Sequence, residues 1–137
     1  MSEQEKNKAA IRQFFDGMNK GDFTIWDKLC APGYIFHHNT GDYTIEQSKK
    51  YMSNILAALP DSNASIEDMV AEGDKVALRY TLRGTHKGIF RGIAPTGKQI
   101  TVTAFEINRL SGGKCVETWG VTDYLSIMQQ LGAIPKM

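Results

Sequence analysis

The sequence predicts an α+β fold in which three helices pack on a strongly curved antiparallel sheet and enclose an internal pocket. Two observations lead to this prediction. Apolar residues follow mostly a helical period as far as Pro60 and alternate with polar residues after it. The second half contains long hairpins joined by glycine turns, and long hairpins twist enough to curl a sheet around helices. Such a curl leaves a concave apolar space of the kind that binds small ligands.

The first half of the chain carries the helical patterns. The first predicted helix starts at the capping pair Ser2 and Glu5 and ends before Gly21. A short second helix is expected from Asp22 through Cys30, with a stop at Pro32. A short strand over residues 34–38 and a turn over 39–42 follow. A third helix starts at the capping pair Thr44 and Gln47 and ends at Pro60.

The second half alternates with a period of two, as strands do. Strands are expected at residues 65–71, 76–82, 99–110 and 115–124, with a helical tail at 125–131. Residues 84–97 are predicted to form a glycine-rich loop, and its part from Gly88 to Gly97 is expected to be a rim or lid over the opening of the curled sheet.

Composition narrows the functional classes. The chain has 137 residues, so a single domain over residues 1–137 is expected. A net charge of +1 argues against a partner recognised through its phosphates, such as nucleic acid. No apolar run is long enough for a membrane span, and the polar N-terminus is unlike a signal peptide. Two distant cysteines fit reduced thiols, which predicts a cytoplasmic protein.

Several short motifs, in order along nearly the whole chain, carry a family resemblance. They are Phe14-Phe15, Asn19-Lys20-Gly21-Asp22, Ala31-Pro32-Gly33-Tyr34, residues 70–76, 84–88, 92–98 and 112–114, Glu117-Thr118-Trp119 and Gln130-Leu131-Gly132. In these motifs the chain resembles the SnoaL-like polyketide cyclases, also labelled ester cyclases, of the NTF2-like superfamily. The resemblance implies a cone-shaped fold and an aldol-type ring closure or isomerisation of a hydrophobic carbonyl compound. It implies acid/base chemistry without a cofactor, and a homodimer paired across the outer sheet faces.

The resemblance also identifies where this chain departs from the family. The acidic catalyst of the family aligns with Gly120, which has no side chain to move a proton. Polar pocket groups of the family align with Phe36, Ala104 and Glu106. The expected substrate-binding residues are therefore Phe36, Arg79, Ala104, Asn108, Thr118, Trp119 and Gly120.

Three residues are candidates for the missing acid/base group. Glu106 alternates with Phe105 and Ile107, so it points away from those apolar side chains and is a candidate base. His37 is a candidate pocket acid/base, and Asp123 lies near the end of the last strand. Each has a structural alternative. Glu106 could face solvent or pair with an arginine, His37 could be a hydrogen-bonded structural residue, and Asp123 could be a helix cap or an ion-pair partner.

Arg79 interrupts an alternating strand and is expected either to bind an anionic ligand group inside the cone or to pair with a neighbouring acid. Three histidines, two of them adjacent on one strand, do not predict a metal site. Three functions stay open at this stage. They are an acid/base enzyme, a binding protein that has lost the catalyst, and an interaction module that uses the outer sheet face.

Overall fold

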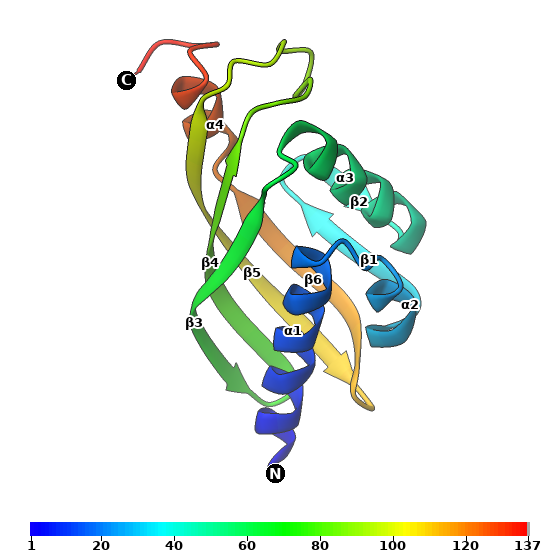
Figure 1. Cartoon of the computed structure of the whole chain (residues 1–137). Coiled ribbons are helices and arrows are strands. Elements are labelled where there is room, and N and C mark those ends of the chain that lie inside the picture. The colour runs from blue at the N-terminus through cyan, green and yellow to red at the C-terminus, as the bar shows by residue number, and fades with distance from the viewer. Residues whose placement is uncertain (137) are drawn as a thin grey trace.

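A curved, unclosed sheet with helices packed on one face forms the fold (Figure 1). The structure is a computed structural model and describes residues 1–136. Those residues form four helices, α1 (Glu3–Asn19), α2 (Ile25–Leu29), α3 (Ile45–Ala58) and α4 (Tyr124–Gln130). Helices α1, α2 and α3 cover the concave face, while α4 lies at one end near the C-terminus (Figure 1). The predicted α+β architecture is confirmed.

Six strands make up the sheet, in the order β2-β1-β6-β5-β4-β3. Their bounds are β1 (Cys30–His38), β2 (Gly41–Tyr43), β3 (Asn63–Glu72), β4 (Lys75–Thr85), β5 (Gln99–Ser111) and β6 (Lys114–Thr122). All neighbours are antiparallel except β1 and β6, which run parallel. The sequence did not predict this parallel pair, because it joins strands that are far apart in the chain.

The start of β1 differs from the expectation. The segment Pro32-Gly33 was predicted to end a helix, but it lies inside β1. The register between β1 and β6 shifts between Cys30 and Ile35, and Gly33 adopts a φ of 84°. Proline cannot donate to a ladder and glycine tolerates positive φ, so both residues suit an irregular stretch of strand. The expected turn at residues 39–42 also overlaps β2, which pairs back on β1 as a short hairpin.

Two predicted helix starts are confirmed in detail. The Ser2 hydroxyl accepts a hydrogen bond from the Glu5 amide at 3.1 Å. Thr44 and Gln47 form a reciprocal capping box, with bonds of 3.3 Å and 3.0 Å between their side chains and backbone amides. Such caps satisfy amides that the first turn of a helix leaves unpaired, and they fix where α3 begins.

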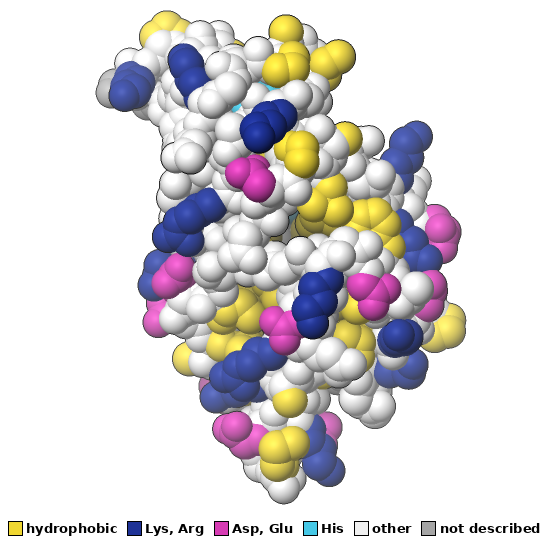
Figure 2. Space-filling model, viewed as in Figure 1, with side chains coloured by type: hydrophobic (Ala, Val, Ile, Leu, Met, Phe, Trp, Pro, Cys, Tyr) yellow, Lys and Arg dark blue, Asp and Glu magenta, His cyan; other side chains and the backbone are white. Residues whose placement is uncertain are grey.

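The core consists of two groups of buried side chains. One lies beneath α1 and α2 and includes Ile11, Phe15 and Trp26; the other lies beneath α3 and α4 and includes Leu59 and Ile127. Side chains of both groups line the internal cavity described below. On the helical side, basic and acidic side chains are interspersed (Figure 2). None of the described helices combines the length and apolar character that a membrane span requires.

Candidate functional site

A largely apolar cavity of about 90 Å³ lies between the helices and the inner face of the sheet. Ten polar side chains of the described residues reach it. Those that do are Tyr34, His38, Ser48, Tyr51, Tyr80, Glu106, Asn108, Thr118, Thr122 and Tyr124. The hydroxyls of Tyr51 and Tyr124 are hydrogen-bonded to each other, and both residues also line a groove of about 600 Å³.

Glu106 supplies the carboxyl group of this cavity. It lies on β5, directly opposite Leu78 of β4 and Gly120 of β6. The alternation of β5 turns it inward, away from the exposed Phe105. Burial disfavours the carboxylate and raises the pKa of Glu106 to about 7, although the hydrogen bond from Asn108 acts in the opposite direction. A carboxyl group with this pKa can both accept and return a proton near neutral pH.

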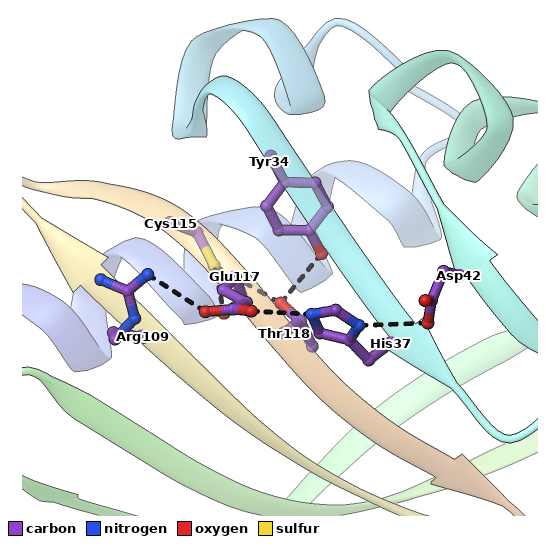
Figure 3. A network of polar contacts seen from close by, with 7 residues as sticks. All are labelled: Tyr34, His37, Asp42, Arg109, Cys115, Glu117 and Thr118. Atoms are coloured by element: carbon purple, nitrogen blue, oxygen red, sulfur yellow. Dashed lines mark hydrogen bonds and ion pairs between the residues drawn. The ribbon is translucent and has the colours of Figure 1, made fainter.

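A series of hydrogen bonds holds Asn108, the hydrogen-bond partner of Glu106, in place. The Asn108 amide donates to the Glu106 carboxyl at 3.2 Å, and the Asn108 carbonyl accepts from the Thr118 hydroxyl at 2.7 Å. Thr118 in turn accepts from the Tyr34 hydroxyl at 2.9 Å, a contact drawn in Figure 3. Because its oxygen is already engaged, the Asn108 side chain presents its NH₂ group to Glu106. The network therefore fixes the direction of the bond to the carboxyl group.

The position opposite Glu106 leaves no room for a side chain. A Cβ atom at Gly120 would lie 2.9 Å from Cε1 of the Phe36 ring and 3.5 Å from the Cβ atom of Glu106. Both Phe36 and Glu106 line the cavity. The Phe36 ring thus takes up the space next to Gly120, and the only carboxyl group at this point of the cavity wall, within residues 1–136, comes from β5.

His38, rather than His37, is the histidine of the cavity. Its two ring nitrogens lie 2.7 Å from the Thr40 hydroxyl and 3.1 Å from the Thr122 hydroxyl. Burial, assisted by the charge of Arg91, lowers the pKa of His38 to about 4. The ring is therefore neutral at pH 7 and serves as a hydrogen-bonding group among the surrounding aromatic side chains.

The model of the SnoaL-like polyketide cyclase family matches residues 8–131. The chain belongs to this family. Among solved structures, AclR of Streptomyces galilaeus, a candidate hydroxylase, is 29% identical with a TM-score of 0.90, covering 98% of this chain and 85% of its own. IdmH of Streptomyces antibioticus, a candidate polyketide cyclase, is 29% identical with a TM-score of 0.84, covering 92% and 98%. TsrD of Streptomyces laurentii is 25% identical with a TM-score of 0.87, covering 98% and 100%. A comparison with curated proteins gave no match.

In this SnoaL-like chain, several candidates from the sequence lie inside the curled sheet. Phe36, Glu106, Asn108 and Thr118 line the cavity. Ala104 and Gly120 are buried on the same inner face, although neither is part of the cavity wall. The family alignment selected this face, and alternation extended it to Asn108 because β5 and β6 are regular where they pass Glu106.

Other candidates of the SnoaL-like chain lie on the outer face. His37 bridges two carboxylates, with contacts of 2.7 Å to Glu117 and 3.1 Å to Asp42 (Figure 3). Glu117 also pairs with Arg109 at 3.1 Å. The bonds to Glu117 and then Asp42 raise the pKa of His37. Trp119, 39% exposed, stacks on the His37 ring, so both residues lie outside the cavity.

Arg79 and Asp123 have structural partners outside the cavity. Arg79 pairs with Asp68 at 2.7 Å on the outer face, which is the second of the two alternatives that the sequence left open, rather than pointing into the cone. The parity of β4 explains this, because Leu78 and Tyr80 face inward. Asp123 is exposed and caps α4 by accepting a hydrogen bond from the Ser126 amide at 3.0 Å. Neither acts on a ligand in the cavity from these positions.

The predicted rim segment contributes one side chain to the SnoaL-like cavity. Phe90 is buried and lines it, and the guanidinium of neighbouring Arg91 lies 5.0 Å from the centre of the Tyr124 ring.

Within residues 1–136, no group of three or more histidine, cysteine or acidic side chains is arranged to hold a metal ion. Sequence reasoning missed His38 and Ser48; the parity shared with Phe36 could have identified the first, and no local pattern marks the second.

Proposed function

We propose that this SnoaL-like chain is an acid/base enzyme that needs no cofactor and acts on a hydrophobic carbonyl compound. Glu106 takes a proton from the carbon next to the carbonyl group, and the resulting carboxylic acid returns a proton to carbon or oxygen. This sequence of steps serves either an aldol-type ring closure or an isomerisation. The observation that carries the proposal is the Glu106 carboxyl group in an apolar cavity, with a pKa of about 7.

The replacement of the family acid by Gly120 fits this proposal. Glu106 and Gly120 are cross-strand partners, so their side chains would start from neighbouring points on one face of the sheet. A carboxyl group on β5 can therefore reach the region that a side chain on β6 would occupy. Phe36 fills the space beside Gly120, which makes the relocated carboxyl group compatible with a packed wall.

Acetophenone offers a direct test, because its methyl protons lie next to a carbonyl group and exchange negligibly with neutral water. We expect the protein to catalyse exchange of these protons in heavy water, followed by NMR. The rate should rise with pH through about 7, since the base must be ionised. Glu106→Gln should lower the rate by about 100-fold or more, the usual contribution of a general base.

Glu67→Gln is the matched control, because Glu67 is exposed on β3. It should leave the exchange rate unchanged. Full activity in Glu106→Gln would contradict the assignment of the base. Retention of acetophenone without any exchange would instead favour a binding protein of the same fold.

We further propose that a second copy of the chain covers the outer sheet face. Apolar side chains gather there around a groove of about 760 Å³. They include Val70, Phe105 and Val121, which are 66%, 57% and 58% exposed. An exposed apolar patch at the centre of a sheet is typical of a protein interface.

Light scattering during gel filtration would test this interface. Phe105→Glu should convert a dimer to a monomer, whereas Thr103→Glu, exposed on the same strand but outside the groove, should not. A wild-type protein that is monomeric at micromolar concentrations would contradict the proposal and leave the face to a different partner.

A further inference from the structure

The Ser48 hydroxyl is a buried polar group without a partner in the cavity wall. Ser48 lies in the first turns of α3, is 2% exposed and lines the cavity. Within residues 1–136 its oxygen makes no hydrogen bond. Burying a hydroxyl without a partner is unfavourable, so such a group calls for an explanation.

The usual local partner does not satisfy this hydroxyl. A serine inside a helix commonly donates to the carbonyl four residues earlier, here that of Thr44. That carbonyl accepts the Ser48 backbone amide at 2.8 Å, but not the hydroxyl. The polar side chains of the opposite wall have other partners, since Asn108 bonds to Glu106 and Thr118, and His38 bonds to two threonines. Ser48 is therefore free to bind a group that enters the cavity.

The helix wall and the sheet wall thus offer different chemistry to one small space. Met52 and Ile55, one and two turns along α3, supply apolar surface beside Ser48. The sheet wall presents the Glu106 carboxyl group. Ser48 and Glu106 thus line the same cavity of about 90 Å³ from opposite walls.

We propose that Ser48 is a substrate-binding residue whose hydroxyl donates a hydrogen bond to the carbonyl oxygen of the ligand. This bond would turn the adjacent carbon toward Glu106 and would strengthen as negative charge develops on that oxygen. The ligand class, a hydrophobic compound with an oxygen acceptor, rests on the proposed function. The unpartnered hydroxyl does not.

Two probes of nearly equal shape separate the hydrogen bond from apolar burial. Acetophenone carries a carbonyl oxygen where α-methylstyrene carries a CH₂ group. Dissociation constants of both would be measured by protein-detected NMR titration for wild type, Ser48→Ala and Ser53→Ala. Ser53 is exposed on the same helix, so its replacement controls for the helix preference of alanine.

We expect the preference for acetophenone over α-methylstyrene to fall about 3- to 10-fold in Ser48→Ala, as for the loss of one hydrogen bond. It should stay unchanged in Ser53→Ala. Without ligand, Ser48→Ala should unfold at a temperature no lower than that of Ser53→Ala, because no bond is lost. An unchanged preference, a lower unfolding temperature, or no binding of either probe to wild type would overturn the inference.

The exchange assay keeps this inference separate from the proposed function. Exchange that depends on Glu106 but an unchanged probe preference in Ser48→Ala would remove Ser48 from the site and leave the function intact. No exchange in wild type, with the probe preference reduced in Ser48→Ala, would refute the function and retain Ser48 as a ligand-binding residue.

Discussion

The two faces of the sheet hold the same kinds of titratable side chain in opposite states. On the inner face, burial raises the pKa of Glu106 to about 7 and lowers that of His38 to about 4, so each is held toward its neutral form. On the outer face, Glu117 and His37 bond to each other; the pKa of Glu117 is lowered and that of His37 is raised. His37 and His38 are adjacent on β1, so their side chains point to opposite faces of the sheet and acquire opposite roles.

This comparison shows what each face is suited to do. Paired charges on the outer face satisfy one another and are screened by water, so they contribute little beyond local order. The Glu106 carboxyl group, which forms no ion pair within residues 1–136, keeps its proton until near pH 7, which is the property that a general base and acid requires. The inner face therefore carries the candidate chemistry.

The largest expected effect is a difference in how stability depends on pH. The pKa of Glu106 is raised above its ordinary value of about 4.5, so its ionisation costs stability as pH rises through 7. Glu106→Gln should therefore be more stable than wild type above pH 7, by on the order of 3 kcal/mol, and similar to it near pH 4. Urea unfolding at several pH values measures this.

Glu117→Gln is the matched outer-face variant and should behave in the opposite way. The pKa of Glu117 is lowered in the wild type. Its carboxylate therefore contributes to stability above the ordinary pKa of a glutamate, and this contribution is lost as pH falls. Equal pH trends for the two variants would mean that the two faces do not differ as described.

A smaller effect is expected from Gly120→Ala. The added Cβ atom would lie 2.9 Å from the Phe36 ring, and forcing a methyl group into a packed wall costs about 1–3 kcal/mol. Phe36→Leu should relieve most of this cost in the double variant. A free energy of unfolding that is additive for the two substitutions would show that Phe36 does not set the size limit at Gly120.

The smallest effect is expected from His37→Asn on the outer face. The pKa of His37 is raised in the folded protein. The contribution of His37 to stability is therefore present below the ordinary pKa of a histidine and is lost as pH rises through the raised pKa. The variant should lose a little stability at pH 5, nothing at pH 9, and less at high salt. A large loss at every pH would indicate that His37 has a packing role rather than an ionic one.

Strand alternation predicted much of the fold and part of the site. Glu106, Asn108 and Thr118 were grouped on one face by alternation, and the family alignment identified that face as the inner one. Alternation from Phe36 would also have placed His38 on the inner face, and alternation from Tyr80 would have placed Arg79 on the outer one. Alternation therefore sorts residues by face but does not say which face is the inner one, since apolar Phe105 and Ile107 face outward while apolar Leu78 faces inward.

Other features depend on contacts that no local pattern contains. Pro32 and Gly33 are strong stop signals, yet pairing with β6 draws them into an irregular strand. Ser48 differs from an ordinary helical serine because, among the described residues, no neighbour accepts or donates a hydrogen bond to its hydroxyl. Whether a polar group is satisfied is a property of the assembled wall, and so it is visible only in three dimensions.

The most direct test of the central claim is a titration of the Glu106 carboxyl carbon by NMR in wild-type protein, with Glu106→Gln to assign the signal. We expect a midpoint near pH 7, set by burial in the cavity. A midpoint near 4.5, the ordinary value for a glutamate in water, would show that the carboxyl group is solvated and would contradict its role as the base of this site.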